Sequence, residues 1–144
     1  MIQEYKHKLL SGKPCMIHAD FIPSMDLFCR YLELTGCSAL INSAYREDSK
    51  NIKGAIVTPS KISNHFVGCA IDCNIFDKKK TLWSSKMLEV PKAEVLTLIG
   101  LVRRSKLLRW GGDFQVRDTV HFDNALNILN KKRWDEIYEE LHTS

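Results

Sequence analysis

The chain has 144 residues, of which 44% are hydrophobic and 26% charged, and its formal net charge is +4. This length and composition fit one globular domain over residues 1–144 and exclude a disordered tail. The modest positive charge favours an anionic partner. It does not predict nucleic-acid binding, because the densest basic run, residues 78–80, has no interleaved aromatics and is typical of a solvated loop.

The N-terminal sequence and the cysteines indicate in which cellular compartment the protein is made. The first residues, MIQEYKHKLLSGKPC, lack the apolar run of a secretory signal, and no stretch approaches the roughly 20 apolar residues of a membrane-spanning helix. We therefore expect a protein that is cytoplasmic as synthesised and acts elsewhere only if released. Reduced, buried thiols are expected for the odd set of cysteines, which forms no CxxC pair: Cys15, Cys29, Cys37, Cys69 and Cys73.

Apolar spacing predicts the elements of the first half. A polar N-terminal helix is expected around His7, and a helix with one apolar face over residues 25–32. Residues 38–45 are small and β-prone and predict a strand. A polar loop is expected over 47–62, followed by a second strand over 70–75.

The second half continues the mixture. Pro91 opens an expected helix, 107–110 predicts a short strand, and the glycines at 111–112 predict a tight turn. Residues 119–123 alternate as in a strand, and 134–141 have the spacing of a C-terminal amphipathic helix. Because helices and strands mix without regular βαβ alternation, we expect an α+β fold with a mainly antiparallel sheet and packed helices.

Two of the five histidines stand out because each lies near a carboxylate on a predicted sheet element. His65 precedes Asp72, while His121 lies between Asp118 and Asp123. The remaining histidines are expected at the surface or without an obvious partner: His7, His18 and His142.

These residue types suit a metal. Two imidazoles, one carboxylate and a water form the open coordination of a catalytic zinc, whereas structural zinc closes its shell with four ligands, usually rich in thiolate. Cys69 and Cys73 lie on either side of Asp72 and could reach a metal, but they are expected to be small core residues. Spacing alone leaves the alternative open, a core histidine beside a surface aspartate.

A resemblance to a known family bears on that choice. SNHFVGCAID at 63–72 resembles the S-x-H-x-x-G-x-A-x-D signature of the zinc D-alanyl-D-alanine carboxypeptidases and L-alanyl-D-glutamate endopeptidases. WGGDF at 110–114 with DTVHF at 118–122 is similar to the closing motif of their VanY-type and phage-endolysin branch, and SAYR at 43–46 resembles S-G-Y-R. The matches follow the family's order over residues 43–122, and nothing before residue 43 adds to them.

The resemblance implies residue roles within a Hedgehog/DD-peptidase-like fold. His65, Asp72 and His121 would bind one Zn²⁺ per chain. Asp118 falls at the position of the general base, and Arg46 at that of the arginine contacting the substrate or the oxyanion. Substrate contacts are implied for four further residues: Tyr45, Ser63, Trp110 and Asp113.

The implied function is that of a zinc-dependent hydrolase acting on bacterial peptidoglycan stem peptides. The WGGDF–DxxHF form favours an endolysin-like L-alanyl-D-glutamate endopeptidase. A D-alanyl-D-alanine carboxypeptidase or dipeptidase stays open, because pocket walls rather than metal ligands choose the bond. A non-catalytic zinc-containing binding module is the third possibility, which the retained Asp118 disfavours. No nucleic-acid partner or membrane insertion is expected, and a monomer is the default.

Overall fold

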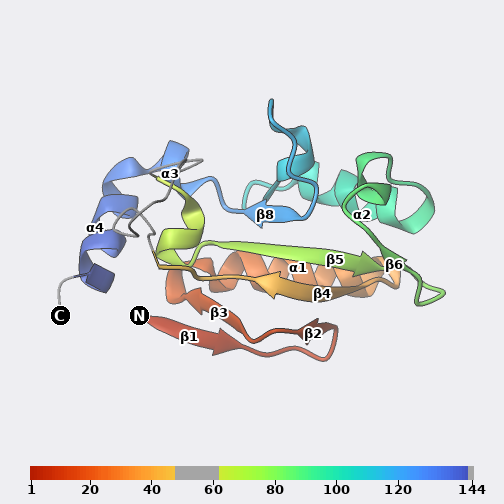
Figure 1. Ribbon diagram of the computed structural model, residues 1–144, viewed down its shortest axis with the longest axis horizontal. Coiled ribbons are helices and arrows are strands. Elements are labelled where there is room, and N and C mark those ends of the chain that lie inside the picture. Colours follow the sequence, from red (N-terminus) through yellow and green to blue (C-terminus); the bar gives the residue numbers. More distant parts are fainter. Residues whose placement is uncertain (48–61, 143–144) are drawn as a thin grey trace, which may run out of the picture.

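The computed structural model describes residues 1–47 and 62–142 and has the α+β architecture expected from the sequence (Figure 1). The main sheet has the order β2-β4-β5-β8-β7, with β6 paired to β5. Its strands are β2 (Leu10–Gly12), β4 (Ser38–Ser43), β5 (Ala70–Phe76), β6 (Leu82–Trp83), β7 (Arg109–Trp110) and β8 (His121–Asp123). All of its pairings are antiparallel except the parallel pairing of β2 with β4, so the mainly antiparallel sheet is confirmed.

The N-terminal segment differs from the expectation. The predicted polar helix around His7 is wrong, because β1 (Ile2–Tyr5) and β3 (Cys15–His18) form an antiparallel two-stranded sheet. His7 lies in the connection after β1, where its Nδ1 accepts a hydrogen bond from the Leu9 amide. Pairing with a strand that buries Cys15 and Ile17 decides the conformation here, and tertiary contacts of this kind override local propensity.

Within the described residues, four α-helices accompany the sheet: α1 (Ile22–Thr35), α2 (Ala93–Arg104), α3 (Leu126–Leu129) and α4 (Lys131–His142). Pro23 stands in the first turn of α1, and Gly36 ends the helix with φ of 76°, a left-handed conformation that glycine adopts without strain. Helix α1 runs along one face of β4 and β5 (Figure 1). The core lies between them, and the rings of Phe28 on α1 and Phe122 on β8 are 4.9 Å apart.

Most predicted elements are present with shifted ends. The strand expected over 38–45 ends at Ser43, and those expected over 107–110 and 119–123 shorten to β7 and β8. The glycines at 111–112 lie in a 3-10 turn. Residues 48–61 of the expected polar loop lie outside the described residues. Across the described ranges, no helix is long and apolar enough to cross a membrane.

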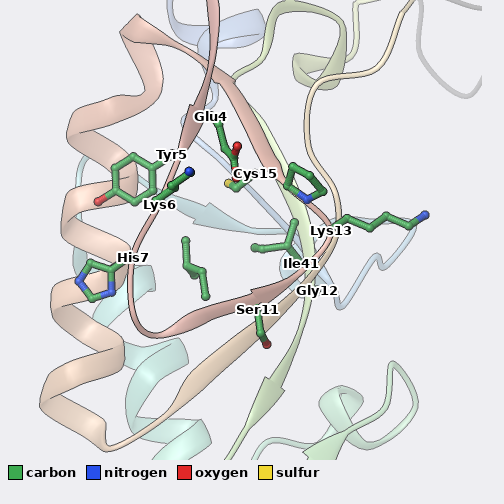
Figure 2. A pocket seen from close by; sticks show the side chains of 11 residues that line it. Glu4, Tyr5, Lys6, His7, Ser11, Gly12, Lys13, Cys15 and Ile41 are labelled. Atoms are coloured by element: carbon green, nitrogen blue, oxygen red, sulfur yellow. The ribbon is translucent and has the colours of Figure 1, made fainter.

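All five cysteines are buried free thiols, as expected. Cys15 borders a small hollow of about 180 Å³ between the β1–β2 connection and β4 (Figure 2). Figure 2 shows Glu4 pointing toward Cys15, while Lys13 extends away from the hollow. Burial, with smaller effects from Cys29 and Glu4, raises the pKa of Cys15 to about 12. The thiol is therefore protonated near neutral pH and is no nucleophile.

Candidate metal centre and its cleft

The register of β5 and β8 places two of the candidate ligands, Asp72 and His121, side by side. In β5 the side chains alternate, so buried Ile71 and Cys73 face the core and Asp72 faces the opposite side of the sheet. Asp72 pairs directly with His121 on β8. Residues directly opposite in an antiparallel pair have neighbouring side chains, and the His121 Nδ1 lies 3.4 Å from the Asp72 Oδ1.

His65 reaches the same point from a turn that precedes β5. It lies in a 3-10 helix (Asn64–Val67) capped by Ser63, whose hydroxyl accepts from the His65 amide. Gly68 ends this helix with φ of 69°, and a Cβ there would lie 2.6 Å from the His18 nitrogen. A glycine is therefore required for the chain to turn back into β5. The His65 Nε2 lies 3.2 Å from the Asp72 Oδ1.

Neighbouring acceptors fix which ring nitrogen of each histidine faces the centre. The Nδ1–H of His65 donates to the Ala44 carbonyl at 2.7 Å, which leaves Nε2 to face Asp72. His121 is reversed, because its Nε2 lies 2.6 Å from the Asp123 Oδ2 and its Nδ1 faces Asp72. Metal-binding imidazoles commonly donate their other N–H to a carbonyl or a carboxylate in this way.

The donor set fits zinc. One atom each from His65, Asp72 and His121 lies within 4.8 Å of the others, the one such group among the residues that the structure describes. Tetrahedral zinc with bonds of about 2.05 Å separates its ligand atoms by roughly 3.3 Å. The distances of 3.2 and 3.4 Å from the two histidines to the Asp72 oxygen agree with that separation. The buried Cys69 and Cys73 are not members of the group.

Without a metal, the carboxylates hold a proton on His121. Burial alone would lower its pKa, but hydrogen bonds with Asp123 and Asp72 outweigh burial and raise the pKa of His121 to about 9. Burial is likewise outweighed at Asp72, whose pKa lies well below its usual range because His121 and His65 bond to it. The two carboxylates therefore favour positive charge at the position of the His121 ring.

Asp118 and Arg46 flank this centre at the surface of a cleft of about 660 Å³. The Asp118 Oδ2 lies 4.0 Å from the His121 Nδ1, and the carboxylate is half exposed. Burial and the charge of Asp72 raise the pKa of Asp118, which suits a group that accepts a proton. The Arg46 Nη1 lies 3.8 Å from the Asp72 Oδ2, and 52% of its side chain is exposed.

The four residues with implied substrate contacts lie in different surroundings. Ser63 lines the cleft, but Tyr45, Trp110 and Asp113 are not among its lining residues. Trp110 is buried, and its indole N–H donates to the Thr119 carbonyl at 2.8 Å. Tyr45 is half-buried, and Asp113 forms a bidentate pair with Arg103. The structure therefore gives Trp110 and Asp113 packing and surface-pairing contacts rather than a place in this cleft.

Three polar residues of the cleft have no counterpart in the sequence-based predictions. Arg109, Arg117 and Asn127 line the cleft together with His121. Asp123, two residues after His121 on the same strand, faces the same side of the sheet and bonds to its Nε2. The alternation of side chains along a strand was the signal for Asp123, but no spacing links Arg109 or Asn127 to the histidines.

Comparisons with known proteins agree with this site. Residues 57–124, which include all three metal candidates and Asp118, match the family described as D-alanyl-D-alanine carboxypeptidase. Among solved structures, the L-Ala D-Glu endopeptidase ChiX of Serratia marcescens is similar, with 18% identity and a TM-score of 0.51 over 77% of this chain and 82% of that chain. At that identity the likeness is one of fold. Among curated proteins, no sequence matches the chain. The resemblance predicted from the motifs is confirmed.

Proposed function

We propose that this chain is a zinc-dependent peptidase that cleaves the L-alanyl-D-glutamate bond of peptidoglycan stem peptides. The proposal is supported by the match of residues 57–124 to the family described as D-alanyl-D-alanine carboxypeptidase and by the likeness of the fold to that of an L-Ala D-Glu endopeptidase. The observation that carries the proposal is the convergence of His65, Asp72 and His121 beside a cleft that also exposes Asp118 and Arg46. Three protein donors leave a coordination position open, as catalytic zinc requires.

Each residue has a distinct task in the proposed hydrolysis. Zinc held by the two histidines and Asp72 would supply Lewis-acid polarisation and a water of lowered pKa. Asp118, half exposed and with a raised pKa, accepts the proton of the attacking water and passes it to the departing amine. Arg46 presents a permanently charged fork that binds a substrate carboxylate or the developing oxyanion.

Backbone hydrogen bonds hold Asp118 in its position. Its N–H donates to the Gly111 carbonyl at 2.9 Å, and its own carbonyl accepts from the His121 amide at 3.1 Å. The candidate base therefore belongs to the same turn as one candidate ligand, which fixes their separation. A pure binding module has no use for a carboxylate beside the metal ligands, which favours catalysis.

The test is digestion of purified peptidoglycan by the zinc-loaded protein, with the new termini identified by mass spectrometry. We expect new D-Glu amino termini, their loss with a chelator, and turnover lowered at least 100-fold in Asp118→Asn, with zinc still bound. Asp135→Asn is the matched control, because this exposed carboxylate pairs with Lys131 on α4, away from the cleft. Undiminished turnover in Asp118→Asn would remove Asp118 from the mechanism.

A second bond specificity has its own support, because the matched family is described as D-alanyl-D-alanine carboxypeptidase. The same digestion separates the two, since that activity releases free D-alanine from pentapeptide stems. Zinc binding without any new terminus would favour the non-catalytic binding module.

A further inference from the structure

Arg109 stands at the centre of a hydrogen-bond network that the proposed reaction does not use. Its guanidinium donates from Nε to the Asp123 Oδ1 at 2.6 Å and from Nη2 to the Asp123 Oδ2 at 3.1 Å. The same Nη2 also lies 3.3 Å from the Asn127 Oδ1. The guanidinium further stacks 4.6 Å from the centre of the Phe114 ring. One side chain on β7 therefore contacts β8, α3 and the cleft wall.

On one side the network ends at a candidate ligand. Asp123 is 2% exposed and lies 2.6 Å from the His121 Nε2. Its Oδ1 also accepts from the Ala125 amide at 2.8 Å. With both oxygens engaged, the carboxylate is held in one orientation, which in turn orients the imidazole so that Nδ1 faces Asp72.

On the other side the network ends at Asn64, the residue that precedes the candidate ligand His65. The Asn64 Nδ2 donates to the Asn127 Oδ1 at 3.1 Å, and the Asn64 Oδ1 accepts from the backbone N–H of Asn127 at 3.0 Å. The Asn127 Nδ2 donates to the Ile62 carbonyl at 3.0 Å. Asn64 is buried, and its neighbour His65 lies in the same short 3-10 helix.

We propose that Arg109 is a positioning residue that couples the two metal-binding histidines, through Asp123 to His121 and through Asn127 to the turn of His65. The inference rests on the proposed metal centre and deepens it. The two histidines come from segments 56 positions apart in sequence (65 to 121), so neither local segment alone sets their separation. Arg109 supplies a bidentate fork together with a third contact, a geometry that lysine cannot reproduce.

The test measures zinc affinity by competition with a chromogenic chelator, in Arg109→Lys and in wild type. Loss of an orienting partner commonly weakens metal binding 10- to 100-fold, and we expect a fall in this range. Arg103→Lys is the matched control, because Arg103 also forms a bidentate pair with an aspartate, Asp113, but on the surface outside the cleft. We expect its zinc affinity to equal that of wild type.

A second variant keeps the inference testable if Arg109→Lys folds poorly. Asn127→Ala preserves the Arg109–Asp123 pair and removes the link to Asn64. We expect it to lower zinc affinity by itself, and to add little to Arg109→Lys in the double variant, because both act through one network. In ¹H–¹⁵N NMR spectra of the histidine side chains, the chemical shift of the His121 Nε2 proton should also lose its hydrogen-bonded value in Arg109→Lys.

The outcomes distinguish the positioning role of Arg109 from the proposed metal centre. Reduced unfolding temperature with unchanged zinc affinity in both variants would overturn the positioning role while leaving the proposed peptidase intact. A wild-type chain that binds no zinc would overturn the proposed metal centre, and the coupling of its ligands with it.

Discussion

The charge on His121 predicts how the stability of the metal-free protein depends on pH. Its pKa is about 9 in the folded chain, against an ordinary value of 6.5. A histidine whose folded pKa is raised stabilises the fold fully below its unfolded pKa, and this stabilisation is lost as pH rises toward the folded pKa. From these two values the contribution of His121 falls from about 3 kcal/mol at pH 6 to about 1 kcal/mol at pH 8, a loss of about 2 kcal/mol.

Urea unfolding followed by tryptophan fluorescence at pH 6, 7 and 8, with a chelator and a reductant present, measures this loss. The comparison is between wild type and His121→Asn, which lacks the titrating ring. His18 titrates with the opposite sign, because burial is the main cause lowering its pKa, but it is present in both proteins and its effect cancels. We expect the wild-type free energy of unfolding to fall more steeply with pH, by about 2 kcal/mol across this range.

Bound zinc should reverse the sign of this pH dependence of stability. The metal must displace the proton from the His121 Nδ1, so its affinity rises about tenfold per pH unit below the pKa of that ring. Zinc-loaded protein should therefore gain stability from pH 6 to pH 8, whereas the metal-free protein loses it. Parallel pH profiles for metal-free wild type and His121→Asn would contradict this prediction, since they would mean that Asp72 and Asp123 hold no extra proton on His121.

Two further substitutions probe the turn that carries Asp118. In Gly111→Ala the new Cβ would collide with the Asp118 carbonyl and lie 2.9 Å from the His121 Cβ, so we expect at least tenfold lower peptidase activity and a stability loss of about 1–3 kcal/mol, measured by turnover and urea unfolding. Trp110→Phe removes the buried hydrogen bond to Thr119, and we expect a loss of about 1–2 kcal/mol with KM unchanged. A raised KM at full stability would instead return Trp110 to substrate binding.

The sequence predicted the part of the fold whose signals are local. Helix α1 has an apolar stripe and a terminal glycine, and β5 and β8 alternate clearly, so their existence followed from pattern alone. The N-terminal two-stranded sheet could not be predicted in the same way, because β1 has weak alternation and becomes a strand by pairing with β3. Such pairing depends on contacts between distant residues, and no short window of sequence contains them.

The same distinction applies to the site. His65, Asp72 and His121 lie in motifs with fixed spacing, and the structure brings these three together. Arg109 and Asn127 belong to no spacing pattern, and they join the centre only because β7 pairs with β8 and α3 follows directly. Trp110 shows that a motif does not by itself predict the environment of each of its residues. It lies inside a recognisable motif, but the structure buries it in the core.

The candidate site depends on one register of one strand pair. Asp72 lies opposite His121, and the two-residue period of a strand puts Asp123 on the same face as His121. A slip of one residue would turn the imidazole toward the helices and bring Phe122 to the cleft side. The packing of Phe122 against Phe28, 4.9 Å away on α1, opposes that slip. The apolar core on one face of the sheet thereby specifies the geometry of the polar centre on the other.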